Sequence, residues 1–363
     1  MLRWLSRLFG TGPGAAGREE RMAPHAGAEG AEAARAAPPV DSDGSGFAPF
    51  AAVLGITPSQ PPLLSEEAEE EDERVAGLVL DHFRKNRPGP ASAPSLSLQI
   101  LSLVATPRTG AADLARLIQA DPALAASVLH VANSAYHRGV QEVESVRDAV
   151  ARIGLEEAGR VAGALAAKSL FSPRMRQEFA AYAGPWSDLY LRAVTVATVS
   201  ATLAMRTRSA RSDRAYLGGM LLDVGKSVAL RSLAALTVDR VVEPSPERLE
   251  RVLDRVHVEI GGEVHQEWSL PQYLTVLCVR HHEDAVPADP EFWDLHVVRL
   301  VSALEDLRRS PASAHAPVEV VQSAQALRVD PHGARALVAE LRTTCERIAR
   351  TFPIGSGLRS AGP

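Results

Sequence analysis

The stretch GGMLLDVGK, residues 218–226, has the composition of a helix end that could hold a divalent cation. It is apolar and rich in glycine, and it reaches Asp223 shortly before Gly225 and Lys226. An adjacent His-Asp pair would supply the nitrogen and oxygen donors that hold such an ion for phosphate chemistry. The residue before Asp223 is Leu222, which offers no donor atom. The sequence therefore leaves open whether this stretch has retained metal chemistry or lost it.

A structural role explains the same residues without a metal. Gly225 favours the end of a helix, where the carboxylate of Asp223 could accept hydrogen bonds from backbone or hydroxyl groups. A lysine close to a helix C-terminus is stabilised by the helix dipole, which would account for Lys226. Gly218 and Gly219 are small enough to permit close packing against a neighbouring helix. We predict this structural role for Asp223 and Lys226.

No other catalytic motif stands out in the chain. There is no G-x-x-x-x-G-K-[ST] phosphate-binding loop and no G-x-S-x-G nucleophile elbow. Cys278 and Cys345 form no C-x-x-C pattern, and neither has a convincing histidine partner, so neither a disulfide framework nor a structural zinc site is expected. We predict no catalytic residue, no cofactor and no metal site.

Charge and hydropathy exclude further classes of protein. The 363 residues include 39 basic and 44 acidic side chains, a net charge of −5, which argues against nucleic-acid binding. No apolar run approaches the roughly 18–20 residues that span a bilayer, and the N-terminus lacks the pattern of a secretory signal. We expect a protein of the reducing cytoplasm.

The first 65 residues differ in composition from the rest. Residues 10–65 are dominated by Gly, Ala, Pro and Ser, which cannot bury enough apolar surface to fold, and they predict a disordered tail. Residues 1–10, MLRWLSRLFG, place apolar side chains largely on one helical face. This segment could contact a membrane surface or dock on a partner, or it could be an ordinary frayed terminus.

Residues 66–90 predict an acidic helix followed by a linker. Seven of the eight residues 66–73 are acidic, which suits a solvated helix N-terminus, and apolar residues then recur at helical spacing. Pro88, Pro90 and Pro94 mark a boundary near residue 90.

Beyond this boundary the apolar pattern is helical and strand-like alternation is scarce, which predicts an all-α fold. Asp121 and Pro122 have the types expected at a helix start, while Ser145, Asp148 and Gly154 predict a capped helix with a left-handed stop. Further helices are predicted over 155–171, 174–182, 187–206, 213–222, 246–268, 271–282 and 291–308. Residues 289–350 carry additional helix, and 351–363 read as a frayed tail.

Five segments in order make the chain resemble an HDOD domain, the regulatory relative of the metal-dependent HD phosphohydrolases. They are DPALAASVLHVANSAY (121–136), SVRDAVARIGLEEAGRV (145–161), PWSDLYLRAVTVATVSATLA (185–204), GGMLLDVGKSVAL (218–230) and HVEIGGEVHQEWSLPQYLTVLCVRHHE (257–283). The resemblance covers residues 91–288 and implies an HDOD-type bundle of helices in a bacterial cytoplasmic protein. Residues 289–363 would form a C-terminal helical extension and frayed tail.

The resemblance also implies where an HD enzyme would hold its ion: an upstream His, an adjacent His-Asp pair and a distant Asp. In this chain those positions carry Asp188, Leu222 with Asp223, and Ser302. Only Asp223 keeps the ligand type, and Asp188 is a poor substitute for imidazole. The resemblance therefore implies that the enzymatic metal site is degenerate.

His257, His281 and His282 match positions where HD-type proteins often have histidines. We predict that they hydrogen-bond helix ends and neighbouring carboxylates such as Glu283 or Asp284. A rebuilt metal or phosphate site with Asp223, or a ligand-sensing role without catalysis, remains open.

Two other features have local explanations. Asn133 and Ser134 are predicted to stop one helix and cap the next, with direct ligand contact as the alternative. Trp268, followed by Leu270 and Pro271, is predicted to anchor the core at a turn between helices.

We therefore expect a non-catalytic bacterial signal-transduction protein whose HDOD domain binds a partner protein or a small signal. The alternative is a divergent metal-dependent phosphohydrolase or phosphodiesterase that uses Asp188, Asp223, His257 and His281 or His282 to hold Mn or Fe.

Overall fold

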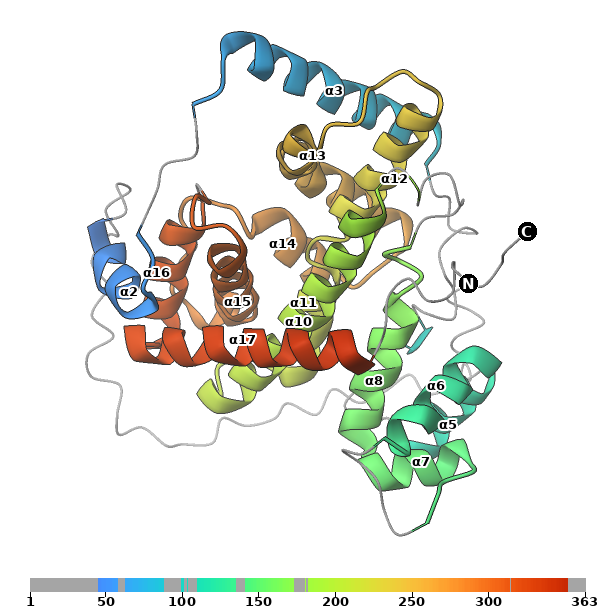
Figure 1. The fold of residues 1–363 in the computed structure, drawn as a ribbon. Coiled ribbons are helices and arrows are strands. Elements are labelled where there is room, and N and C mark those ends of the chain that lie inside the picture. The colour runs from blue at the N-terminus through green and yellow to red at the C-terminus, as the bar shows by residue number, and fades with distance from the viewer. Residues whose placement is uncertain are drawn as a thin grey trace, which may run out of the picture. The chain divides into compact units, whose positions relative to one another are not determined.

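The computed structural model describes residues 45–57, 63–87, 99–100, 103, 110–134, 141–172, 180, 182–313 and 315–351 (Figure 1). These residues form helices joined by turns, and no strand occurs among them, which confirms the predicted all-α fold. Within this part of the chain no helix combines the length and apolarity needed to cross a membrane. The predictions for residues 1–44, most of the helix at 174–182, and residues 352–363 lie outside the described residues.

Part of the segment predicted as a disordered tail is folded. The 3-10 helix η1 (Ser45–Phe47) and helix α2 (Ala48–Leu54) bury Phe47 and Phe50 in one apolar cluster with the C-terminal helices. There η1 contacts α16 (Ala316–Leu327) and α2 contacts α17 (Pro331–Thr351) (Figure 1). The tail prediction is therefore wrong for residues 45–57, because two phenylalanines supply the apolar surface that the average composition hides.

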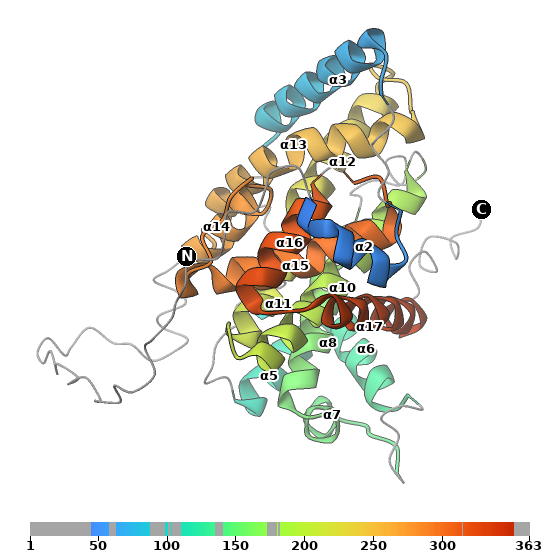
Figure 2. The ribbon, with the colours of Figure 1, turned by 90° about the vertical axis from the view of Figure 1, so that its left-hand side faces the viewer.

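Helix α3 (Glu66–Lys85) lies along α13 (Pro246–Glu267), as Figure 2 shows. Its N-cap Ser65 accepts a hydrogen bond from the backbone N–H of Ala68. The acidic first half was predicted to be solvated, but Asp72 is fully buried and accepts hydrogen bonds from Arg251 at 2.5 and 3.2 Å. Charge pairing with a second helix therefore replaces solvation at the centre of the acidic run.

Four helices form a small apolar cluster of their own: α5 (Ala111–Gln119), α6 (Pro122–Ala132), α7 (Val146–Ile153) and α8 (Leu155–Ala167). The predicted caps are present, because Asp121 accepts a hydrogen bond from the Leu124 N–H and Ser145 accepts one from the Asp148 N–H. Gly154 has the positive φ expected of a glycine stop, 82°, with an extended ψ of 152° rather than a left-handed helical one.

Asn133 has a different role from the one predicted. It follows the last residue of α6, but it is not among the described residues with positive φ, so it is not a left-handed stop. Its side-chain amide instead donates to the Val143 carbonyl and accepts from the Val143 N–H, both at 2.9 Å. Asn133 thereby ties the end of α6 to the segment that leads into α7.

The central helices are α10 (Ala183–Thr207), α11 (Ser212–Leu221), α12 (Val224–Val238), α13, α14 (Gln272–Arg280) and α15 (Trp293–Arg309), the last preceded by the 3-10 helix η3 (Pro290–Phe292). Trp268 is buried at the end of α13, as predicted. Side chains of α10, α11 and α14 share an apolar cluster with α15, α16 and α17. The C-terminal extension thus packs on the helices that carry the HDOD-like motifs.

Helix α12 was missed by the sequence analysis, which treated Gly225 as a helix end. Gly225 is the second residue of α12, and most side chains of this helix are buried. A helix buried on several sides has no one-sided apolar stripe, so the periodic signal is weak.

Close helix packing depends on the glycines of the GGMLLDVGK stretch. A Cβ on Gly219 would lie 2.8 Å from the Cα of Ala197 on α10, and one on Gly225 would lie 2.8 Å from the backbone nitrogen of Gly261 on α13. The same Cβ on Gly225 would collide with the carbonyl oxygen of His257. The lack of a side chain at Gly219 lets α11 pack closely on α10, and the lack of one at Gly225 lets α12 pack closely on α13 beside His257.

Candidate functional site

Asp223 occupies the short turn between α11 and α12, at the centre of a group of buried polar side chains. One of its carboxylate oxygens, Oδ2, accepts a hydrogen bond from Arg192 on α10. The other, Oδ1, faces His257 on α13 and His281 just after α14. The two sides of this one carboxylate therefore have different chemistry.

On the first side the guanidinium of Arg192 is buried and bonded to three acceptors. Besides Asp223 it donates to the Ser302 hydroxyl at 2.8 Å and to both carboxylate oxygens of Asp306 at 2.8 and 3.0 Å. Ser302 and Asp306 lie one turn apart on α15. Burial raises the pKa of Asp223, but the charges of Arg192 and Lys226 outweigh it and hold that pKa well below its usual range. Asp223 and Arg192 are thus a charged, buried pair.

The predicted role of Asp223 and Lys226 at a helix C-terminus is wrong. Asp223 is the N-cap residue of α12, but its side chain makes no cap hydrogen bond, and its Oδ2 accepts from Arg192 instead. Lys226 lies in the first turn of α12, at the end where the helix dipole disfavours a cation. Its ammonium instead pairs with Asp254 on α13 at 2.7 Å. Charge pairing across helices outweighs the local dipole here.

Asp188 is not part of this group. Its side chain is 57% exposed, and its nearest ion-pair partner is Arg309 at 3.7 Å. Arg192, one turn further along α10, is the residue that reaches Asp223. Leu222, which stands where the resemblance would place a histidine, is buried in the apolar cluster with α15.

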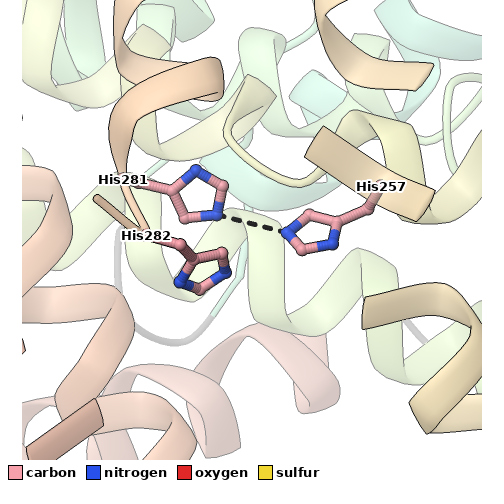
Figure 3. A group of neighbouring side chains, drawn as sticks. All are labelled: His257, His281 and His282. Carbon is pink, nitrogen blue, oxygen red and sulfur yellow. Dashed lines mark hydrogen bonds between the residues drawn. The ribbon is translucent and has the colours of Figure 1, made fainter. Parts of the chain in front are cut away.

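On the second side of Asp223 three histidines gather, as Figure 3 shows. The Nε2 atoms of His257 and His281 are 3.3 Å apart. Asp223 Oδ1 lies 3.5 Å from the first of these nitrogens and 3.7 Å from the second, and none of the described residues donates a hydrogen bond to it. One ring nitrogen of His282 also points toward this space (Figure 3). A ligand atom from each of the three histidines lies within 4.8 Å of the others.

The hydrogen bonds on the far side of each ring decide which nitrogen carries the proton. Nδ1 of His257 lies 2.9 Å from the Asp254 carbonyl oxygen, and Nδ1 of His281 lies 2.7 Å from that of Cys278. Because a carbonyl only accepts, each Nδ1 must be the donor, and each neutral ring then presents a lone pair at Nε2. Burial lowers the pKa of both rings, with Lys226 adding to the effect at His257 and His282 at His281. Two acceptor nitrogens therefore face each other and an acceptor oxygen.

His282 has a carboxylate partner, but not the predicted one. Its Nδ1 lies 2.6 Å from Glu319 on α16, while Glu283 pairs with Arg280. Burial lowers the pKa of His282, but the bond to Glu319 and that group's charge outweigh it and raise the pKa above its ordinary value. The prediction of carboxylate contact holds, and the partner comes from the C-terminal extension.

The comparisons agree with this architecture. A family model described as the HDOD domain matches residues 91–284, more than half of the chain. The chain belongs to the HDOD family. A search of curated proteins found no match to this HDOD protein.

Two solved structures share its fold, and a third is less similar. An HDOD domain protein of unknown function from Geobacter sulfurreducens is 21% identical, with a TM-score of 0.54 over 77% of this chain and 99% of that one. A Marinobacter aquaeolei protein with a provisional assignment to signal transduction is also 21% identical, with a TM-score of 0.51 over 71% of this chain and 58% of that one. A Shewanella amazonensis protein with a provisional assignment as a metal-dependent phosphohydrolase is 16% identical, with a TM-score of 0.49 over 74% and 99%.

The two sides of Asp223 differ in how they would receive the divalent ion of HD-type enzymes. On the α10 and α15 side the donors do not fit, because a guanidinium already fills the position beside Asp223 and Leu222 is apolar. On the α13 and α14 side, histidine nitrogens and an unpaired carboxylate oxygen do fit an ion of the transition series.

Arg192 was missed by the sequence analysis, although the sequence contains a signal for it. It is a lone charge within the apolar run of α10, at a position where the helix is buried on either side of it. Charged residues are almost never fully buried unless paired, so such a position indicates a partner in the core.

Proposed function

We propose that this protein is a non-catalytic signalling protein whose HDOD domain binds a partner protein or a small signal. The observation that carries the proposal is the buried bond between Arg192 and Asp223. In an HD-type enzyme this carboxylate would face the ion that activates water. In this protein the guanidinium of Arg192, which is always charged, lies beside Oδ2 of Asp223 instead.

The surroundings of Arg192 support the same conclusion. Its Nε and Nη2 groups donate to Ser302 and Asp306, so α15 and the turn that carries Asp223 both hold the guanidinium in place. A catalytic ion also needs an open coordination position for water and phosphate. The guanidinium occupies that side of Asp223, and Leu222 supplies no donor.

Regulation through such a scaffold requires only a modest energy. A coupling of about 1–3 kcal/mol between a bound signal and a partner-binding surface changes affinity by roughly 5- to 150-fold. A family placement of residues 91–284 and a fold shared with a Marinobacter aquaeolei protein provisionally assigned to signal transduction are compatible with this role.

A phosphodiesterase assay tests the proposal. The full chain is incubated with Mn²⁺ or Fe²⁺ and with bis(p-nitrophenyl) phosphate or a cyclic dinucleotide. We expect no turnover above that of the free metal ion. Metal-dependent turnover that disappears in the Asp223→Asn variant would show an enzyme and overturn the proposal.

The second candidate, a divergent metal-dependent phosphohydrolase, is favoured by the three histidines and the unpaired Oδ1 of Asp223. It would also need Asp188, which is largely exposed and paired with Arg309. In that case Asp188→Asn would abolish turnover, whereas a non-catalytic protein has no turnover for it to remove.

A further inference from the structure

We propose that His257, His281, His282 and Asp223 form a closed, non-catalytic site for one divalent transition-metal ion, with Zn²⁺ as its natural class of ligand. The inference rests on the proposed function in one respect, namely that the bound ion acts as a regulatory input rather than as a catalyst. The proposed ligand atoms are the Nε2 atoms of the three histidines, which form one cluster, and Oδ1 of Asp223, which lies beside Nε2 of His257 and of His281.

Three acceptor lone pairs converge between α13 and α14. The Nδ1 protons of His257 and His281 are donated to backbone carbonyls, which leaves two Nε2 lone pairs facing each other at 3.3 Å. The buried Oδ1 of Asp223 lies beside both and accepts no hydrogen bond within the described part of the chain. Buried acceptors without a donor are costly, and a shared cation satisfies all three at once.

The spacing of these acceptor atoms suits a tetrahedral ion. A tetrahedral Zn²⁺ with bonds of about 2.0–2.1 Å to nitrogen and oxygen separates neighbouring ligand atoms by about 3.3–3.4 Å. The distances between the two Nε2 atoms and Oδ1 are 3.3, 3.5 and 3.7 Å. These three ligand atoms therefore already stand close to the spacing that such an ion requires. The ligand atom of His282 lies within 4.8 Å of the other two histidines, so its ring would move toward Asp223 when the ion binds.

The outer hydrogen bonds of the three rings are those of metal-binding histidines. Histidines that bind metals almost always donate their second N–H to a carbonyl or carboxylate, which fixes the ring and makes the ligand nitrogen more basic. All three rings meet this condition, since His282 donates to Glu319 while the other two donate to backbone carbonyls. The free nitrogen of His282 points toward the other rings (Figure 3).

With Asp223 as the fourth ligand beside the three histidines, the site would be closed. Structural zinc sites are usually coordinated by four protein groups, whereas catalytic sites keep one position for water. Arg192 holds Oδ2 of Asp223 on the opposite side and leaves only Oδ1 for the ion. The ion would thus be bound without the open position that hydrolysis needs, in agreement with a non-catalytic protein.

Glu319 gives the site a connection to the C-terminal extension. This carboxylate is buried on α16, and α16 is the helix against which η1 packs. An ion bound to Nε2 of His282 makes the Nδ1–H a stronger donor to Glu319. Metal binding would therefore tighten the attachment of α16, and with it of the N-terminal segment, to the HDOD core.

The experiment measures metal binding directly in the full chain. Protein is stripped with a chelator, loaded with Zn²⁺ or Co²⁺, dialysed and analysed for metal content, and the visible absorption of bound Co²⁺ reports tetrahedral nitrogen and oxygen coordination. We expect one ion per chain, a tetrahedral Co²⁺ spectrum and a higher melting temperature with Zn²⁺. Absence of retained metal and of the Co²⁺ spectrum in the wild-type protein would overturn the inference.

Matched variants locate the site. His257→Gln and His281→Gln should weaken Co²⁺ binding at least 100-fold, and Glu319→Gln by roughly 10- to 100-fold through its effect on His282. His265→Gln is the control, because His265 is a buried histidine on the same helix outside the cluster. Circular dichroism checks that each variant folds, and equal loss in His265→Gln and His257→Gln would count against the assignment.

The phosphodiesterase assay on the loaded protein separates this inference from the proposed function. Bound ion without turnover supports both. Bound ion with turnover retains the site but overturns the non-catalytic function. No bound ion and no turnover overturns the metal site and leaves the proposed function standing.

Discussion

Arg192 and Asp223 form a buried ion pair between α10 and the turn that precedes α12. The pair divides the site into two sides. Oδ2 of Asp223 accepts a hydrogen bond from the guanidinium. Oδ1 faces two imidazole rings, those of His257 and His281.

Removal of Arg192 should be costly for stability. In Arg192→Met the buried carboxylate of Asp223 loses its counter-charge, and breaking one partner of a buried pair costs about 3–5 kcal/mol. Arg206→Met is the control, since Arg206 forms a largely exposed pair with Glu340 and should cost less than about 1 kcal/mol. Urea unfolding measures both variants, and equal costs would contradict the buried pair.

The close packing of α12 on α13 should depend on Gly225. In Gly225→Ala the added methyl group would collide with the His257 carbonyl, so we expect a loss of about 1–3 kcal/mol or more in the free energy of unfolding. Gly77→Ala on α3 meets no atom within 4 Å and should stabilise the protein by up to about 1 kcal/mol. Melting temperatures compare the two substitutions. A neutral Gly225→Ala would mean that the helices are further apart.

The attachment of α3 should depend on one acidic residue more than on its neighbours. Asp72→Asn removes the negative charge of the carboxylate that accepts hydrogen bonds from two N–H groups of Arg251. Because a hydrogen bond to a charged group contributes about 1.5–3 kcal/mol, we expect a loss of stability of this order. Glu73→Gln serves as control, because the nearest atom of Arg255 is 3.9 Å away and both groups are exposed enough to be solvated. Hydrogen exchange of the α3 amides would report detachment, which should be faster in the first variant only.

Stability should fall in mild acid because of His265. Burial lowers the pKa of this residue to about 4 despite its contact with the Leu221 carbonyl. In the unfolded chain the imidazole of His265 is protonated below about pH 6.5, whereas in the folded chain it is protonated only below about pH 4. The free energy of unfolding therefore decreases as the pH falls from about 6.5 to about 4. The shift corresponds to about 3 kcal/mol.

Comparison with His265→Gln measures that contribution. The difference in unfolding free energy between wild type and variant should change between pH 7 and pH 4, with the wild type losing more. A difference that stays constant over this range would show that His265 does not titrate as its burial requires.

The sequence by itself determined the helical class, the capping of individual helices and the family resemblance. Periodic apolar residues and local caps such as Ser145 with Asp148 act within a few residues, so their effect can be read from the order of the chain. It also showed that Leu222 cannot bind a metal ion. The sequence did not predict the folded segment at 45–57, because its two phenylalanines are buried only by packing with α16 and α17, which lie far away in the chain.

Only the tertiary structure decided what surrounds Asp223. Arg192, His257, His281 and Glu319 lie on different helices or in the turns between them, and their meeting depends on how closely those helices pack. Local periodicity tells which side of a helix is buried, but not which charged group from another helix it will meet there. A buried charge without a partner is energetically costly, so buried charged groups are paired. Helix packing determines which group becomes the partner, because the two groups lie far apart in the chain.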